Sequence, residues 1–316
     1  MALSSLAPSI ALEPVRRPPL VSAGELMLGA WMFYQRHARI FIGISTVPTA
    51  VSLVALLLEE SPLPIAAIAF LLSGIATLLG RLAFIATVSE RGAPAGGVTG
   101  AYQHAVAFFG PFLWISILAG IAILGGMVLF VLPGILLSVW LSFPAYALVG
   151  GHKTGLAALV ASWQAVRGSW LSVAWRFLAF AVMIAALGIL ISIIASIAGR
   201  MAFASLKEAP AMILPLTQIV FFNAIALPLG VIFSWRLWQD LARAHTAREP
   251  RVAKRLRGRL VALIALGIAG ALVWFALGQP KFFEFPGAWS FHPASRGAAS
   301  VLLGGGMPID IIQSIR

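Results

Sequence analysis

The feature that most constrains this chain is a series of apolar runs, each long enough to cross a membrane. In the 28 residues 171–198, Arg176 is the only charged side chain. A helix rises about 1.5 Å per residue, so about 20 apolar residues cross the hydrocarbon core of a bilayer. Runs of this kind recur along the chain. The sequence therefore predicts an all-α, polytopic transmembrane helix bundle.

The composition excludes an ordinary soluble domain. Of 316 residues, 60% are hydrophobic and 10% are charged, and the mean hydropathy is +0.98. Soluble domains carry about 25% charged residues, so this chain has too little charge to cover an aqueous surface. It has no cysteine, which removes disulfides, thiolate metal sites and cysteine nucleophiles.

Seven spans are predicted, six in a core and one C-terminal to it. Pro133-Gly134 alone separates the third span from the fourth, so these two should form a tight hairpin, part of which could be re-entrant. A kink is expected at Pro48 in the first span. The approximate bounds are 40–58, 64–88, 111–132, 135–149, 171–198, 212–235 and 260–277.

Three short aromatic-bearing segments precede the first, third and fifth spans, and each predicts an interfacial elbow helix lying at the headgroups. They run from Ser22 to Arg39, from Gly100 to Gly110 and from Thr154 to Arg167. The first begins with the capping-box spacing of Ser22 and Glu25. The third has an amphipathic stripe of apolar residues. The chain thus reads as three elbow-hairpin units.

Five regions follow along the sequence. We predict a disordered cytoplasmic arm, a six-span domain, a basic cytoplasmic loop, the seventh span and a non-cytoplasmic tail, at 1–20, 21–236, 237–259, 260–278 and 279–316. With the N-terminus inside, 17 of the 22 Lys and Arg residues fall in or beside inner segments and 5 fall in outer segments. The positive-inside rule therefore predicts a multi-pass protein of a bacterial inner or plasma membrane with a cytoplasmic N-terminus.

The strongest electrostatic feature is the basic loop after the sixth span. Basic residues beside apolar spans are typical of topology anchors that contact anionic lipid, and an acidic membrane-protein partner is the alternative. Nucleic-acid binding is not expected, because the segment lacks a folded platform and interleaved aromatics. The predicted contact residues are Arg243, Arg248, Arg251, Lys254, Arg255, Arg257 and Arg259.

Three polar residues within spans form a second candidate site. Arg81 lies near the inner end of the second span, where its side chain either reaches the headgroups or marks a substrate path. Gln218 and Asn223 lie deep in the sixth span, where such amides commonly bond to a neighbouring helix. No Asp or Glu falls within a span, which disfavours a proton-coupled transporter.

Catalytic and cofactor motifs are not expected. The inner-side histidines match no zinc spacing. The runs Gly96-Gly97 and Gly304-Gly305-Gly306 lack the lysine and the strand–helix frame of a phosphate loop. We therefore predict no metal, no cofactor and no enzymatic activity.

One stretch resembles a known family. Leu132-Pro133-Gly134-Ile135, Ser142-Phe143 and Arg167-Gly168-Ser169-Trp170 follow a pattern similar to that of integral-membrane families related to the glycerophosphoryl diester phosphodiesterase membrane domain. The YciC-type uncharacterised inner-membrane proteins are similar. The likeness covers roughly 130–180, and departs from the pattern at Trp140, where members often carry arginine, and near Gly150-Gly151, where an acid is common.

The resemblance implies a six-helix membrane domain with interfacial elbows. It implies no phosphodiesterase activity, because in the enzyme that gives the domain its name the chemistry belongs to a separate soluble barrel. The functional prediction is a non-enzymatic membrane protein that organises lipid or a membrane partner. The alternative is a small permease or channel-like transporter, to which prolines that interrupt spans could give a cavity.

Overall fold

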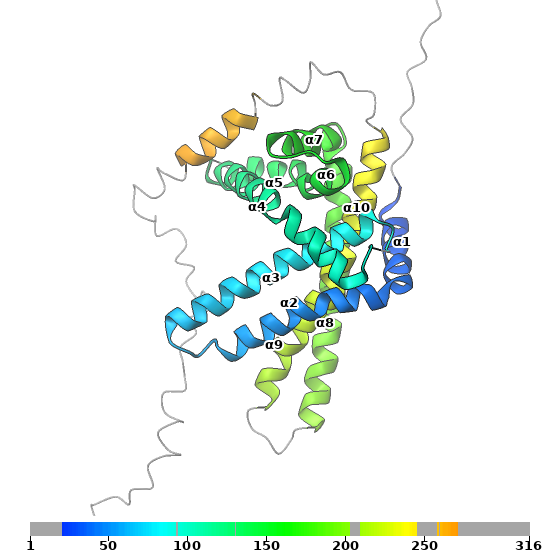
Figure 1. Cartoon of the computed structure of the whole chain (residues 1–316), viewed down its shortest axis with the longest axis vertical. Coiled ribbons are helices and arrows are strands. Elements are labelled where there is room, and N and C mark those ends of the chain that lie inside the picture. The colour runs from blue at the N-terminus through cyan, green and yellow to red at the C-terminus, as the bar shows by residue number, and fades with distance from the viewer. Residues whose placement is uncertain are drawn as a thin grey trace, which may run out of the picture. The chain divides into compact units, whose positions relative to one another are not determined.

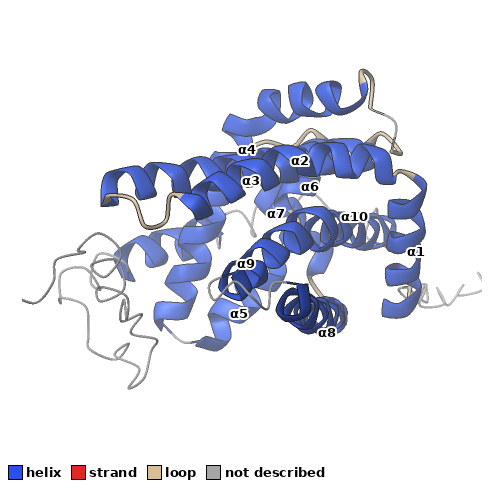
Figure 2. Ribbon diagram, turned by 90° about the horizontal axis from the view of Figure 1, so that it is seen from below, coloured by secondary structure: helices blue, strands red, loops and turns tan. Residues whose placement is uncertain are grey.

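The computed structural model describes residues 21–92, 94–129, 131–202, 209–244, 258 and 260–270. All of these lie in one compact unit, Met1–Ala271. Every regular element in these ranges is helical (Figures 1 and 2). Before the last described helix, Leu260–Gly270, they are α1 Ala23–Arg36, α2 Ala38–Leu57, α3 Leu63–Ser89, α4 Gly97–Leu129, α5 Val131–Trp140, α6 Pro144–Gly151, α7 Leu156–Val166, α8 Trp170–Ala202, α9 Ala209–Phe221, the π-helix η1 Phe222–Ala226 and α10 Leu227–Ala244.

Six helical stretches are long and apolar enough to cross a membrane. Their bounds are Ala38–Leu57, Leu63–Ser89, Gly97–Met127, Gly134–Gly151, Trp170–Met201 and Met212–Arg243. This confirms the predicted all-α polytopic bundle and its six core spans. The helix Leu260–Gly270 covers the first part of the predicted seventh span. The arm 1–20, most of the basic loop, the end of the seventh span and the tail lie outside the described residues.

The first elbow is a separate helix, as its capping residues predict. The Ser22 Oγ accepts the Glu25 N–H and the Glu25 carboxylate accepts the Ser22 N–H, both at 3.2 Å. α1 buries Leu26, Ala30 and Tyr34. Burial raises the pKa of Tyr34, so its hydroxyl stays a donor and bonds to the Ala224 carbonyl at 2.8 Å. The elbow is therefore fastened to the core and not only to a lipid surface.

The prediction that the second elbow is a separate helix is wrong. The structure has one helix, α4, running from Gly97 to Leu129 with Pro111 inside it. Proline is tolerated within membrane helices, where neighbouring helices satisfy the freed backbone groups. Pro48 in α2 and Pro215 in α9 also lie inside helices. Proline therefore marks helix boundaries less reliably here than in a soluble chain.

The fourth span contains a break that the sequence did not predict. Pro133 and Gly134, expected to separate the third span from the fourth, lie inside α5, while α4 and α5 pack against each other as the predicted hairpin requires. The chain leaves the helix before Pro144, which begins α6. Proline disfavours helical backbone in the residue before it. Ser162 of α7 stabilises this break, because its hydroxyl donates to the Trp140 carbonyl at 2.7 Å and accepts the Phe143 N–H at 3.0 Å.

The third elbow, α7, is more deeply buried than its amphipathic stripe predicts. Eight of its eleven residues are buried: Ala158, Leu159, Val160, Ala161, Ser162, Trp163, Ala165 and Val166. Small alanines let α6 and the other neighbours approach closely. α7 is therefore a core helix, with Trp163 stacked on Trp140 at a ring separation of 5.0 Å.

The packed core gathers around α10, which contacts α1, α3 and α7. Phe84 of α3, Tyr146 of α6 and Phe233 of α10 are among its largest fully buried side chains. Residues Phe222–Ala226 just before α10 form a π-helix. The Ser45 hydroxyl fastens this turn to α2 by donating to the Asn223 carbonyl at 2.9 Å.

Two glycines allow a close helix crossing near the end of the described chain. A Cβ built on Gly125 of α4 would lie 1.9 Å from the Gly267 Cα, a distance that no side chain could occupy. Small residues at such crossings let helix backbones approach in a membrane. The helix Leu260–Gly270 is thus seated directly on α4.

Candidate functional site

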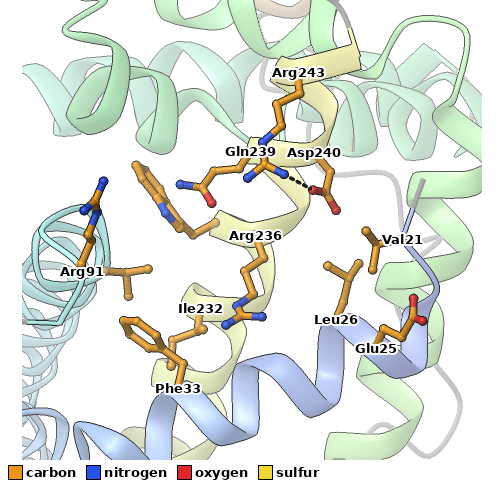
Figure 3. A pocket seen from close by; sticks show the side chains of 12 residues that line it. Val21, Glu25, Leu26, Phe33, Arg91, Ile232, Arg236, Gln239, Asp240 and Arg243 are labelled. Carbon is orange, nitrogen blue, oxygen red and sulfur yellow. Dashed lines mark hydrogen bonds and ion pairs between the residues drawn. The ribbon is translucent and has the colours of Figure 1, made fainter. Parts of the chain in front are cut away.

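A cleft of about 510 Å³ opens where α1, the end of α3 and α10 meet (Figure 3). Its floor is apolar and its rim is charged, with residues contributed by all three helices. Segments at this end belong to the predicted inner side of the membrane. The lining residues are Val21, Glu25, Leu26, Phe33, Val88, Arg91, Ile232, Trp235, Arg236, Gln239, Asp240 and Arg243.

One face of α10 supplies half of this lining. Ile232, Trp235, Arg236, Gln239, Asp240 and Arg243 are spaced as neighbours on one side of a helix. The apolar residues come first and the charged residues follow toward the C-terminus. Basic side chains in the last turn are also favoured by the helix dipole. The end of the sixth span therefore changes from a core helix to a charged wall.

Arg236 lies at the centre of the cleft, directly over α1. A Cβ built on Gly29 would meet the Arg236 Nη1 at 2.0 Å, so the glycine makes room for the guanidinium. In the described part of the chain, no carboxylate lies within ion-pair distance of Arg236. A half-buried guanidinium in this position can accept an anion with its planar set of donors.

Asp240 organises the cations around it. Its Oδ1 lies 3.3 Å from the Arg243 Nη1, and the aspartate side chain is 15% exposed against 76% for the arginine. Arg176 of α8 and Arg236 also act on this carboxylate electrostatically. Arg176 in turn donates from Nε and Nη2 to the Val21 carbonyl, at 2.9 and 2.8 Å. These contacts fix the start of α1 beside α8 and α10.

The charges are unevenly placed across the cleft. In Figure 3, Glu25 and Asp240 lie on the side of Val21, Arg91 lies on the opposite side, and Arg236 lies between them. Glu25 is exposed, and the carboxylate oxygen that caps α1 is Oε2. The cleft therefore offers guanidiniums at the centre and far side, and a carboxylate at the near side.

The predicted basic contact set meets this cleft at one residue. Arg243 lies on its rim, while Arg248, Arg251, Lys254, Arg255, Arg257 and Arg259 lie outside the described residues. In the sequence alone, Arg91 and Arg236 count only among the basic residues of the inner segments, and Asp240 has no assigned role. The helical spacing of residues 232–243 was the available signal, because on one face it places apolar residues first and polar or charged residues after them.

The three polar residues of the predicted intramembrane site do not come together. Arg81 is half-buried, and with Ser234 it reaches the hydroxyl of buried Tyr146, linking α3, α6 and α10. Gln218 bonds to the Ser192 hydroxyl and lines an open groove of about 520 Å³ between α8 and α9. Asn223 is 3% exposed in η1 and donates to the Ile219 carbonyl at 3.1 Å, while its Oδ1 has no hydrogen-bond partner among the described residues.

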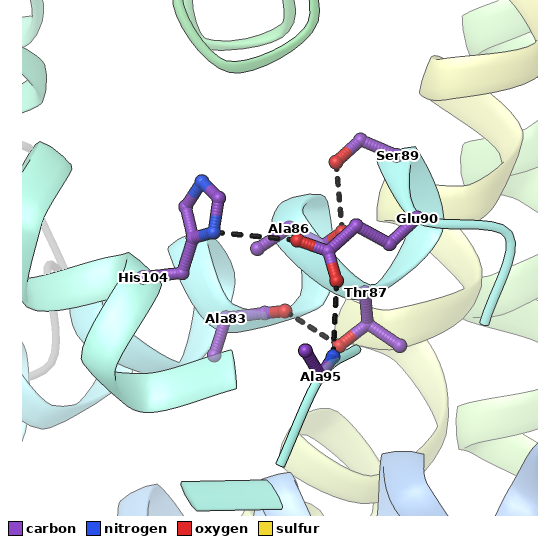
Figure 4. Close-up of polar contacts among 7 residues, drawn as sticks. All are labelled: Ala83, Ala86, Thr87, Ser89, Glu90, Ala95 and His104. Carbon is purple, nitrogen blue, oxygen red and sulfur yellow. Dashed lines mark hydrogen bonds and ion pairs between the residues drawn. The ribbon is translucent and has the colours of Figure 1, made fainter. Parts of the chain in front are cut away.

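A second polar cluster ties α3 to α4 (Figure 4). Glu90 Oε1 lies 3.3 Å from the His104 Nδ1, and Glu90 Oε2 accepts the Ala95 N–H at 3.3 Å. His104 also stacks on Phe108. Within the described residues no group of three metal-ligating side chains occurs. The contacts of Glu90 with His104 and Ala95 stabilise the connection between α3 and α4. We therefore assign Glu90 a structural role.

The amphipathic cleft at α1 and α10 is therefore the best-formed candidate site in the described chain. Its lining combines a 510 Å³ volume, an apolar floor and charges of both signs. Comparison of the chain with protein-family models, with curated proteins and with solved structures finds no match.

Proposed function

We propose that this integral membrane protein binds the phosphate of phospholipid headgroups in the α1–α10 cleft and so organises lipid, without catalysing a reaction. The observation that carries the proposal is Arg236, centred in the cleft over Gly29 and outside ion-pair distance of the described carboxylates. Guanidinium donors match phosphate oxygens in a planar, two-point geometry. A multi-pass membrane protein meets such phosphates at both faces of the bilayer.

The mixed lining suits the headgroup end of a lipid. Leu26, Val88 and Ile232 line the cleft beside its charged residues. A phospholipid places its phosphate beside a glycerol and the start of two acyl chains, so it needs polar and apolar walls next to each other. Sites for small ligands combine such apolar linings with a few placed polar groups.

The location follows the charge distribution. We propose that the cleft faces the cytoplasm of a bacterial inner or plasma membrane, with the N-terminus inside, because most basic residues fall on that side. The basic stretch 245–259 would then gather anionic lipid nearby. We also propose kinship with the glycerophosphoryl diester phosphodiesterase membrane-domain families, on the residues quoted above.

A lipid-retention assay tests the proposal. The purified protein is exchanged into nanodiscs of known composition, and the lipid it retains is quantified after extraction into detergent. Arg236→Gln should weaken retention about tenfold, since it removes a charge-assisted contact. Arg200→Gln is the matched control, because Arg200 is exposed at the far end of α8. Equal retention in the wild type and Arg236→Gln would contradict the proposal.

A small permease is the second candidate, and one observation favours it. The sixth span contains the π-helix Phe222–Ala226, and the buried Asn223 Oδ1 within it has no partner in the part of the chain that the structure describes. π-Helical turns are common at functional sites. Gln218, Ser192 and Arg200 line the groove between α8 and α9, and Asn223 does not. Solute uptake by proteoliposomes that is lost in Asn223→Ala would favour transport over lipid binding.

A further inference from the structure

We propose that the α1–α10 cleft selects a headgroup that carries a primary ammonium beside its phosphate, as in phosphoethanolamine. This inference rests on the proposed phosphate site and names the ligand class that the same site prefers. The observation is that the cleft is lined by carboxylates as well as guanidiniums. Glu25 and Asp240 share its lining with Arg91, Arg236 and Arg243.

A purely anionic headgroup fits this lining poorly. Two carboxylates in the lining repel a phosphate bound between them. A site built only for anions gains nothing from acids in its wall. In a headgroup that carries both a phosphate and an ammonium, the ammonium can bind one of these carboxylates.

The two carboxylates have different roles. Asp240 is held by Arg243 at 3.3 Å and lies in the field of Arg176 and Arg236, so it positions cations. Glu25 is exposed at the mouth, and the described chain places no Lys, Arg or His within ion-pair distance of it. One of its oxygens caps α1. Its other oxygen is the acceptor that an ammonium at the mouth would reach.

Glu25 and the residue beneath Arg236 lie one helical turn apart on α1. Arg236 lies over Gly29 and Glu25 lies one turn earlier on the same helix, α1. Residues four apart on a helix are neighbours on one face. A phosphate on Arg236 would therefore place the ammonium of the same headgroup beside Glu25.

A quaternary choline headgroup is less suited to the site. Choline has no N–H donors, and proteins recognise it with open aromatic faces. Trp235 is 8% exposed and packs against Tyr146 and Gly150. Phe33 packs against His37 at a ring separation of 4.6 Å and against Phe41. The aromatic rings of the cleft are thus engaged by the protein itself.

The test is headgroup competition on the full chain. Nanodiscs contain equal amounts of phosphatidylethanolamine, phosphatidylglycerol and phosphatidylcholine with identical acyl chains, and the retained lipids are quantified by mass spectrometry. The wild type should enrich phosphatidylethanolamine roughly two- to fivefold over each competitor, the range for one exposed charge contact. Glutamine also serves at the third position of a capping box. Glu25→Gln should therefore abolish the enrichment while leaving α1 capped.

Two further variants separate the possible outcomes. Glu60→Gln, at an exposed acid between α2 and α3, should leave the enrichment unchanged. Arg236→Gln should lose all three lipids together. Arg236-dependent retention without headgroup preference, or a preference that survives Glu25→Gln, would overturn the selectivity and leave the proposed function standing. No Arg236-dependent retention would overturn both.

A competition arm identifies the source of the headgroup. Soluble glycerophosphoethanolamine is added to the wild type in the same nanodiscs. Lack of displacement at millimolar concentration supports the intact lipid, because the apolar floor then contributes to binding. Displacement would also support the amine-and-phosphate chemistry, and it would assign the ligand to the soluble headgroup.

Discussion

The sixth span, which ends in α10, and the fifth span, which is α8, are both apolar enough to cross a membrane, yet they are buried to very different extents. In the apolar window of the sixth span, which contains α10, 44% of residues are buried, against 6% in the window of α8. α8 exposes Ile189, Ile193, Ile194 and Ile197 along one side. Hydropathy alone therefore does not distinguish a helix that lipid surrounds from one that organises a site.

The difference follows from what each helix has to contact. α10 meets α1, α3 and α7, and its last turns carry the charged wall of the cleft. α8 meets α10 through the rings of Phe177 and Phe180, which contact Phe233 at 6.0 and 4.6 Å. Beyond these first turns, its main neighbour is α9. Functional polar residues accumulate where protein, and not lipid, covers the helix.

The largest expected effect tests the buried half of this comparison. Phe233→Ala should lower the free energy of unfolding by about 3 kcal/mol, because it leaves a cavity among aromatic rings of α8 and α10. Ile194→Ala in α8, 57% exposed, should change it by less than about 0.5 kcal/mol. Unfolding in mixed micelles, followed by tryptophan fluorescence, measures both. Equal losses would show that α8 is packed against a partner in the membrane.

An intermediate effect is expected at the break between α5 and α6. Ser162→Ala removes the hydroxyl that bonds to Trp140 and Phe143, so two buried backbone groups lose a partner. The expected loss of stability is about 1–3 kcal/mol. Ser138→Ala is the control, since its hydroxyl bonds only within its own helix turn to Ile135. If the two variants lose the same stability, packing alone holds the break between α5 and α6.

The smallest effect sharpens the comparison at the cleft itself. Gly29→Ala places a methyl against the Arg236 guanidinium and should weaken Arg236-dependent lipid retention about threefold, by misaligning one charge-assisted contact. Gly24→Ala in the same helix meets no atom within 4 Å and should leave retention unchanged. Both variants gain up to about 1 kcal/mol of helix propensity. Any effect of helix propensity on stability is therefore shared by the two variants. Equal lipid retention by Gly29→Ala and Gly24→Ala would contradict a role for Arg236 in the site.

Much of the fold could be predicted from the sequence, because apolar run length reports directly on membrane thickness. The six spans, the capping box at Ser22 and the separate helices α1 and α7 follow from local patterns. The continuous α4 and the break before Pro144 do not. Whether a proline ends a membrane helix depends on distant partners such as Ser162, and these are invisible in a local window.

The candidate site was harder to predict for a related reason. Arg236 and Asp240 are ordinary flanking charges until α1 is known to lie across α10, a contact fastened by Tyr34 and Ala224. The sequence emphasised the dense basic residues after 243 and the isolated amides Gln218 and Asn223. Charge density and membrane depth were useful signals for topology. The cleft depends on which helices meet, and no short spacing encodes that.

The crossing of Gly125 with Gly267 has a consequence for how the chain is made. Gly125 enters the membrane early in synthesis, while its partner leaves the ribosome only after three further spans have been translated. Until then the backbone of α4 at Gly125 lacks the helix that covers it in the complete protein. A ribosome-bound chain that ends before Gly258 would leave Gly125 without that cover. The packing of α4 is therefore complete only once the segment that carries Gly267 has been made.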